Sequence, residues 1–160
     1  MKARWPEGDV APAIALAGRA MLAATISRLT EKGFDGLTPA IVAFITKIDP
    51  DGDRATVLAE RAGVTKQAMS QLMRLVTLRG YVEQVPDPTD TRAKIVRCTA
   101  RGLSLRTACL EVRDELHALI VKELGERDAG RLRADLERVS AAFREETAKL
   151  PRPVRKPKKE

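Results

Sequence analysis

Hydrophobic residues recur at spacings of three and four along most of the chain, which is the periodicity of α-helices with one apolar face. The first such segment runs from residue 12 to about residue 32, and Gly33 and Gly36 follow it as helix stops. Its apolar stripe consists of Ile14, Ala17, Met21, Leu22, Ile26 and Leu29. The pattern therefore predicts a long N-terminal helix.

A second helix is predicted to begin at Thr38 and Pro39, because threonine caps helices and proline suits the first helical position. Its apolar face has the spacing i, i+3, i+4, i+7 and consists of Ile41, Phe44, Ile45 and Ile48. The following segment 49–53 reads Asp-Pro-Asp-Gly-Asp. That composition predicts a turn-rich loop.

Two shorter helices are predicted next, over 56–62 and 66–79, with a break at Gly63 between them. Thr65 is expected to cap the second of these helices, and Gly80 to end it. The positions expected to be buried are Val57 or Leu58, Ala59, Met69, Leu72, Met73 and Val76.

A hairpin is predicted to follow these helices. We expect strands at 81–85 and near 94–98, joined by the turn segment 86–91. Its two prolines predict a long, exposed and rigid tip, because proline limits backbone flexibility and cannot donate to a central ladder.

Two long helices complete the pattern, one from a Thr99 cap to about residue 124 and one after Gly125. Each carries a narrow apolar seam at alternating spacings of four and three: Leu105, Cys109, Val112, Leu116 and Leu119, then Leu132, Leu136, Val139 and Phe143. Such seams suit packing against another helix, within one chain or between two. The tail 151–160 is rich in proline and cations and is expected to be disordered.

Composition restricts the function of this 160-residue chain. An aromatic content of 3% argues against stacking platforms for single-stranded nucleic acid. No apolar run reaches the roughly 18 residues of a membrane span, so no membrane role is expected. Two cysteines without CxxC spacing favour a reduced, cytoplasmic location.

The net charge of +7 is concentrated in two segments. Residues 54–97 carry eight Lys/Arg against four Asp/Glu, and residues 151–160 carry five against one. Localised positive charge indicates a polyanionic partner, although a solvated surface would give the same composition. The tail could equally add phosphate contacts or only solubilise the chain.

The predicted order of helix, glycine turn, helix and hairpin inside the positive segment is that of a winged helix-turn-helix. A helix fits the major groove of DNA, and its N-terminal residues reach base edges or phosphates. The polar face of the 66–79 helix offers Thr65, Lys66, Gln67, Ser70, Gln71 and Arg74 as DNA-binding residues. Gln67 and Gln71 can pair with adenine, and the cations can reach guanine or phosphate. An ordinary amphipathic helix with a polar outer face is the alternative.

The hairpin tip strengthens the DNA-binding interpretation. Arg92 can enter the minor groove, where the negative potential is strongest, and Asp90 can hold its guanidinium. Lys94 and Arg97 on the returning strand can contact phosphates. The alternative is an exposed salt bridge of little energetic value.

The stretch TVLAERAGVTKQAMSQLMRLVTLRGYVEQVPDPTDTRAKIVRCTARG, residues 56–102, resembles the winged-helix core of MarR-type bacterial transcriptional regulators. The resemblance implies a homodimer built by the N- and C-terminal helices, DNA reading by the helix after Thr65, minor-groove insertion of Arg92 with Asp90 as its partner, and a small-molecule or oxidant effector. The chain departs from the family at Leu75 and Leu78, where polar residues are usual, and at the tip, which has Asp-Thr-Arg instead of Asp-Arg-Arg.

These observations predict a mainly α (α+β) fold, a winged helix-turn-helix with N- and C-terminal dimerisation helices. The expected parts are residues 1–53 for dimerisation and support, 54–98 for DNA binding, 99–150 for dimerisation and 151–160 as a basic tail. The expected function is that of a ligand-responsive repressor acting as a homodimer on a pseudo-palindromic duplex. The alternative is a winged-helix protein-interaction module that uses Leu75 and Leu78.

No enzyme chemistry is expected. His117 is the only histidine, so a Ser-His-Asp triad has no base, and no residues have metal-ligand spacing. No phosphate-binding glycine motif occurs, so no cofactor is expected. Cys98 and Cys109 are interpreted as small buried hydrophobes, although Cys98 lies beside Arg97 and could be a redox-sensitive thiol.

Overall fold

Three of the helices begin at the threonines that the sequence predicts as caps. In this computed structural model, which describes residues 8–49 and 52–149, the Thr38 hydroxyl accepts from the backbone N–H of Ile41 at 3.3 Å. The Thr65 hydroxyl accepts likewise from Ala68 at 3.2 Å, and that of Thr99 from Gly102 at 3.1 Å. Each cap satisfies one backbone donor of the first helical turn.

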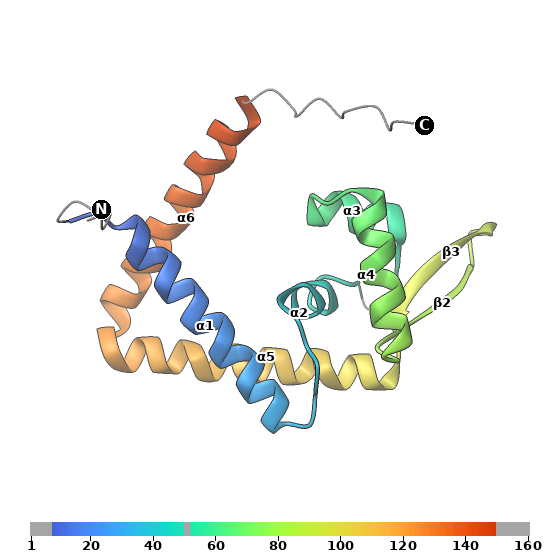
Figure 1. Ribbon diagram of the computed structural model, residues 1–160, viewed down its shortest axis with the longest axis horizontal. Coiled ribbons are helices and arrows are strands. Elements are labelled where there is room, and N and C mark those ends of the chain that lie inside the picture. Colours follow the sequence, from blue (N-terminus) through green and yellow to red (C-terminus); the bar gives the residue numbers. More distant parts are fainter. Residues whose placement is uncertain (1–7, 50–51, 150–160) are drawn as a thin grey trace, which may run out of the picture. The chain divides into compact units, whose positions relative to one another are not determined.

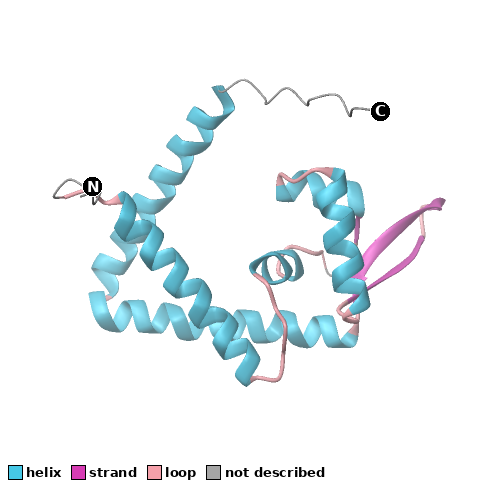
Figure 2. Ribbon diagram, in the orientation of Figure 1, coloured by secondary structure: helices cyan, strands magenta, loops and turns pink. Residues whose placement is uncertain are grey.

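The described part of the chain contains six helices and three strands in the order α1 (Ala11–Glu31), α2 (Pro39–Ile45), β1 (Asp53–Arg54), α3 (Ala55–Ala62), α4 (Lys66–Leu78), β2 (Val82–Asp87), β3 (Asp90–Cys98), α5 (Ala100–Leu124) and α6 (Glu126–Lys149) (Figure 1). Among the described residues helices dominate, and the strands lie in the middle of the sequence (Figure 2). The predicted mainly α winged helix-turn-helix fold is confirmed. The tail 151–160 lies outside the described residues.

The chain divides after Leu116 into two compact units. The first contains α1 to α4, the sheet and most of α5. Within it, Gly63 ends α3 in the left-handed conformation, at φ 64°, which a glycine adopts without steric cost. This turn joins α3 to α4 and completes the helix-turn-helix.

The sheet is antiparallel with the strand order β1-β3-β2, so β2 is an edge strand. The sequence pattern missed β1, because its two residues, Asp53 and Arg54, have no periodicity. The sequence predicts Asp53 in a loop. Its buried carboxylate instead accepts from the Asp49 backbone N–H and from Arg61, each at 2.9 Å.

The hairpin is longer and its turn tighter than predicted. The strands extend to Asp87 and Asp90, which pair with each other, so only Pro88 and Thr89 form the turn. Pro86 is tolerated inside β2 because an edge strand has one unpaired side. Figure 1 shows the hairpin projecting away from α4. The predicted hairpin is confirmed, but the expected strand bounds 81–85 and 94–98 are too short and the expected six-residue turn segment 86–91 is wrong.

The core of the first unit joins the inner faces of the helices to the sheet. Its completely buried side chains include Leu29, Ile41, Ile45, Val76, Tyr81, Leu105 and Val112. Gly102 of α5 lies against Tyr81, because a Cβ at this glycine would come within 1.9 Å of the Tyr81 carbonyl oxygen. The absence of a side chain at residue 102 thus lets α5 approach the start of the hairpin.

Several predicted core positions differ from the structure. The second predicted helix ends at Ile45, although Ile48 is still buried in the turn that follows. Leu72 is only half-buried, and so is Leu75, which the sequence placed on an exposed patch with Leu78. Both half-buried leucines pack against the core.

Helix α1 has a largely exposed apolar stripe. Only Leu29 of this helix is buried, whereas Ile14, Met21 and Leu22 expose 41%, 53% and 37% of their surface. The C-terminal end of α1 is held to α5 by its C-cap residue, Lys32, which forms ion pairs with Glu111 and Glu115. The predicted stripe exists, and most of it has no cover within the first unit.

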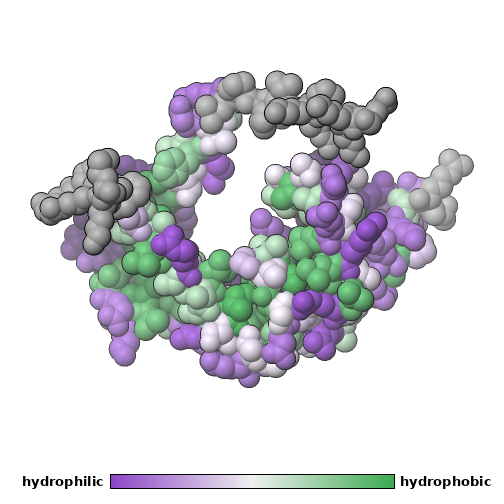
Figure 3. All heavy atoms as spheres, in the orientation of Figure 1, coloured by the Kyte–Doolittle hydropathy of each residue, from purple (hydrophilic) through white to green (hydrophobic). Residues whose placement is uncertain are grey.

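The second unit begins at His117 and contains the end of α5 and the whole of α6. Ala129 is the one buried residue of α6. The predicted apolar seam of α6 is exposed, and Phe143 reaches 67%. Apolar side chains accordingly reach the visible surface on these helices (Figure 3).

Candidate nucleic-acid interface

Helix α4 has two distinct faces, because its apolar residues recur with helical period. Met69, Met73 and Val76 are buried against the core of the first unit. The six predicted DNA-binding residues of this region are all exposed: Thr65, Lys66, Gln67, Ser70, Gln71 and Arg74. The structure therefore brings them together on one accessible side of the helix-turn-helix.

Two of these residues already have partners within the helix. Thr65 caps α4 through its side-chain oxygen. The Ser70 hydroxyl donates to the carbonyl oxygen of Lys66 at 2.9 Å. Both hydroxyls thus stabilise α4 itself, and a phosphate contact would have to use their remaining hydrogen-bonding capacity.

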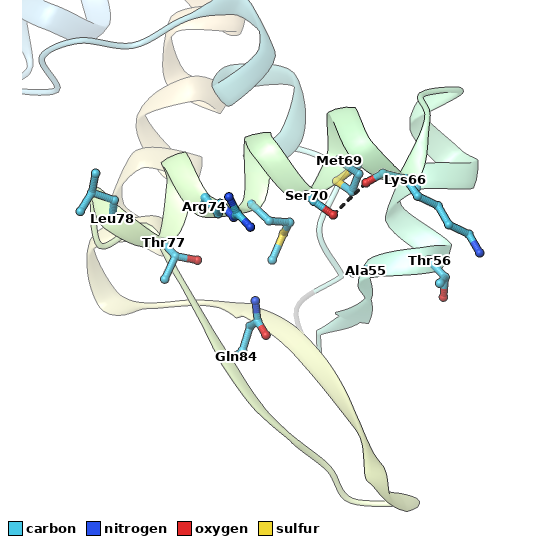
Figure 4. A pocket seen from close by; sticks show the side chains of 11 residues that line it. Ala55, Thr56, Lys66, Met69, Ser70, Arg74, Thr77, Leu78 and Gln84 are labelled. Atoms are coloured by element: carbon cyan, nitrogen blue, oxygen red, sulfur yellow. Dashed lines mark hydrogen bonds between the residues drawn. The ribbon is translucent and has the colours of Figure 1, made fainter. Parts of the chain in front are cut away.

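A groove of about 670 Å³ lies between α3, α4 and β2. Lys66, Ser70 and Arg74 line it from α4, and Figure 4 shows Gln84 pointing from the hairpin toward that helix. Thr56 of α3 and Gln84 of β2 were not singled out by the sequence, because periodicity does not indicate which strand residue will face a helix. The groove supplies cations at one wall and hydrogen-bonding groups at the others.

Asp87 organises the tip of the hairpin. One carboxylate oxygen, Oδ1, accepts from the backbone N–H of Thr89 at 2.8 Å and from its hydroxyl at 2.7 Å. The other, Oδ2, accepts from Arg54 Nε at 2.8 Å and lies 2.6 Å from Arg54 Nη2. The Thr89 hydroxyl and amide, followed by the Arg54 guanidinium, lower the pKa of Asp87 to about 2. The carboxylate is therefore ionised at neutral pH.

The predicted pair of Asp90 with Arg92 is not tested by these contacts. The backbone of Arg92 lies in β3, but its side chain lies outside the described part of the structure. Asp90 Oδ2 is 3.6 Å from Arg54 Nη2. Arg54 is thus a cation beside the tip that the sequence did not indicate.

The returning strand places its two predicted cations differently. Lys94 is exposed and pairs in register with Pro86. Arg97 donates through Nε to Glu83 at 2.8 Å, directly across the β2–β3 ladder. Arg97 is half exposed, and a phosphate would have to compete with this carboxylate.

The cysteines do not have the environment of reactive thiols. Cys109 is buried and Cys98 is half-buried. Burial raises the pKa of both thiols, and at Cys98 the charge of Arg106 offsets this effect in part. A raised pKa disfavours the thiolate, which is the reactive form.

The described residues contain neither a metal-ligand cluster nor a membrane-spanning helix. No group of three or more His, Cys, Asp or Glu side chains in them is arranged to hold a metal ion. None of their helices combines the length and apolar composition that a bilayer crossing requires.

Comparison with known proteins agrees with the fold. Residues 32–93 match the model of the MarR family, and no curated protein matches the chain in sequence. The S. aureus MepR–DNA complex is 18% identical, covering 87% of this chain and 99% of that one with a TM-score of 0.67. A mutant of MarR from E. coli complexed with operator DNA is 20% identical, covering 81% and 92% with a TM-score of 0.67. S. aureus MepR bound to ethidium bromide is 20% identical, covering 81% and 95% with a TM-score of 0.55. The resemblance to MarR-type regulators is thereby confirmed.

Proposed function

We propose that this MarR-type winged-helix protein is a transcriptional repressor that binds a pseudo-palindromic double-stranded DNA site as a homodimer and responds to a small-molecule effector. The observation that carries the proposal is the exposed polar and cationic side of α4 beside the projecting hairpin. Such a protein acts by binding rather than by catalysis, and it acts in the cytoplasm, where bacterial DNA is.

DNA binding is supported by the chemistry of the helix-turn-helix. An α-helix fits the major groove, and Gln67 and Gln71 expose amides that can pair with adenine. Lys66 and Arg74 offer positive charge to phosphates or guanine. Residues 54–97 carry the excess of positive charge that a duplex attracts. The complexes of MepR and MarR with DNA support the same role.

The dimer is supported by apolar surface that each unit leaves exposed. On α1, Leu16 and Met21 expose 62% and 53% of their surface. On α6, Leu136, Val139 and Phe143 line the exposed seam at spacings of three and four. Narrow apolar seams of this kind pack against another helix. A second copy of the chain would cover both faces and place two winged modules on one duplex.

A dimer of this kind would recognise half-sites about one helical turn apart. A dimer bound over a promoter would exclude RNA polymerase from it and so repress transcription. The structure of MepR with ethidium bromide supports the proposal of an effector, since a ligand that favours one spacing of the two modules would change DNA affinity.

The first test is selection of bound duplexes from a random DNA pool, followed by affinity measurements at two salt concentrations. We expect a palindromic sequence to be enriched and its affinity to fall steeply with salt, because phosphate contacts release counterions. Retention without any enriched sequence would contradict sequence-specific regulation.

A protein-interaction module is the second candidate, and Leu78 favours it. This residue exposes 85% of its surface at the end of α4. If the protein retained no duplex and Leu78→Ser abolished capture of a purified protein partner, this alternative would replace the proposal. Its binding would depend weakly on salt, because apolar contacts release few ions.

A further inference from the structure

Arg54 connects the helix-turn-helix to the tip of the hairpin. It is the last residue of β1 and directly precedes α3. Its Nε donates to Asp87 Oδ2 at 2.8 Å, and its Nη2 lies 2.6 Å from the same oxygen. The two residues are 33 positions apart in the sequence. The ion pair therefore joins two parts of the molecule that the backbone joins only through α3, α4 and β2.

The carboxylate at the other end of this connection is enclosed. The side chain of Asp87 is only 7% exposed, while that of Arg54 is 44% exposed. Oδ1 of Asp87 closes the turn by accepting from the amide and hydroxyl of Thr89. One carboxylate thus holds the turn through one oxygen and Arg54 through the other. Removing Arg54 leaves the enclosed carboxylate without its cation, which is costly.

Asp90 adds a second negative charge at the tip. Its Oδ2 lies 3.6 Å from Arg54 Nη2, and Asp90 pairs with Asp87 across the turn. Arg54 Nη2 thus lies within 4 Å of a carboxylate oxygen of each of these two residues. Arg54 therefore offsets charge at the place where the tip must approach phosphates.

We propose that Arg54 is a positioning residue for DNA recognition: acting through Asp87, it holds the hairpin tip in a fixed place relative to α4. The proposal rests on the proposed function. A tip held in advance loses less conformational freedom when it enters a groove, so affinity is higher than for a mobile tip. Arg92 follows Asp90 in β3, so the connection also fixes the strand that carries it.

Arg54 could instead contact a phosphate itself, since it is cationic and partly exposed. A double-mutant cycle separates the two roles. If Arg54 acts through Asp87, either substitution breaks the same connection, and the double variant loses no more affinity than one of them. If Arg54 contacts phosphate directly, its effect is independent of residue 87 and the losses add.

The sign of the Asp87→Asn effect provides a second discrimination. Removing a negative charge from a DNA-facing tip strengthens binding if electrostatics alone decides. The positioning role predicts the opposite, because asparagine cannot hold the Arg54 guanidinium as a carboxylate does.

The experiment measures the affinity of the full chain and its variants for the duplex that the unchanged protein enriches from a random pool. We expect Arg54→Ala and Asp87→Asn each to weaken binding about tenfold and the double variant to bind no worse than either. Additive losses, or stronger binding by Asp87→Asn, would overturn the role of Arg54. Absence of binding by the unchanged protein would overturn the proposed function instead.

Arg61→Ala is the matched control. Arg61 lies on α3, is 48% exposed, and pairs at 2.9 Å with Asp53, whose side chain is 7% exposed like that of Asp87. The substitution removes the same charge and breaks a comparable ion pair away from the tip. We expect a loss of less than about twofold. A tenfold loss here would show that charge or general stability explains Arg54→Ala, and would refute the positioning role.

A readout without DNA completes the test. In the free protein, Arg54→Ala should accelerate hydrogen exchange of the Thr89 amide, measured by NMR, because its acceptor on Asp87 becomes mobile. Arg61→Ala should leave that rate unchanged. An unchanged Thr89 rate in Arg54→Ala would contradict the connection itself.

Discussion

At the scale of single residues, the hairpin tip depends on one carboxylate. Asp87 accepts hydrogen bonds from Thr89 and from Arg54 and is almost fully enclosed. The Asp-Pro-Thr sequence has the composition of a turn in which an aspartate side chain accepts from the backbone two residues on. This local signal could have identified Asp87 from the sequence. Nothing local to residue 54 could have identified Arg54.

The lowered pKa of Asp87 predicts a pH-dependent contribution to stability. Its pKa is about 2 in the folded protein and near 3.8 ordinarily, so the unfolded chain takes up the proton first as the pH falls. The stabilisation is complete above about pH 5 and is lost as the pH falls toward 2. Urea unfolding should show Asp87→Asn less stable at pH 7, with the difference shrinking toward pH 2.

Asp114→Asn serves as the control, because Asp114 lies on an exposed surface of α5. It should change the free energy of unfolding by less than about 0.5 kcal/mol at neutral pH. The difference in unfolding free energy between Asp87→Asn and the unchanged protein should therefore depend on pH. If it stayed constant from pH 7 to pH 2, the lowered pKa of Asp87 would be refuted.

Gly102 gives a second prediction at the residue scale. An added Cβ would come within 1.9 Å of the Tyr81 carbonyl oxygen, which is backbone and cannot easily move. Gly102→Ala should therefore reduce the free energy of unfolding by about 1–3 kcal/mol or more in urea denaturation. Gly130→Ala on α6 meets nothing within 4 Å, and should stabilise the protein by about 0.5–1 kcal/mol. Equal effects of the two substitutions would contradict the close approach of α5.

At the scale of elements, α4 combines two tasks by dividing its faces. Met69, Met73 and Val76 anchor it in the core, and the opposite side is left to the groove beside β2. The core contacts fix the orientation of the helix, so the exposed side chains keep their positions relative to the hairpin. Near the N-terminus of α4, we expect amide side chains to contact bases and cationic side chains to contact phosphates.

Gln67 and Lys66 should separate base reading from phosphate contact. We expect Gln67→Ala to relax specificity at about one base position at a cost of about 1–3 kcal/mol, measured with single-base variants of the selected duplex. Lys66→Ala should weaken binding to all of these duplexes alike and lower the salt slope by about one. Uniform weakening by Gln67→Ala would disprove its base-reading role.

At the scale of the whole molecule, the exposed apolar side chains of α1 and α6 indicate a binding partner. Helices α1 and α6 each expose large apolar side chains, whereas the other helices and the sheet of the first unit form a well-buried core. Burial of such side chains contributes roughly 1.5–3 kcal/mol each. A second copy of the chain is the partner that we propose.

Phe143→Glu should separate dimerisation from folding. Phe143 is 67% exposed, so a charge there costs little within one chain but would be buried in a dimer. Sedimentation should show that the Phe143→Glu variant is a monomer. Circular dichroism should show that its helix content is unchanged. Leu78→Glu, at a residue 85% exposed on α4, should leave the dimer intact. A dimeric Phe143→Glu variant would exclude α6 from the interface.

The sequence by itself determined the helices, the capping residues and the fold class. Helical periodicity and caps are local, so Thr38, Thr65 and Thr99 could be identified without knowing what the helices contact. The same periodicity separated the buried from the polar face of α4. The predicted DNA contacts of these exposed residues, and the division into residues 1–53, 54–98, 99–150 and 151–160, stay predictions.

Only the tertiary structure decided the strand β1, the length of the hairpin and the connection from Arg54 to Asp87. Each depends on which distant segment lies alongside, and a two-residue strand or a single arginine carries no periodic signal. The same holds for Arg97, which faces Glu83 only because of the β2–β3 register. A local pattern specifies the face of an element that will be buried, whereas the three-dimensional packing selects its partner.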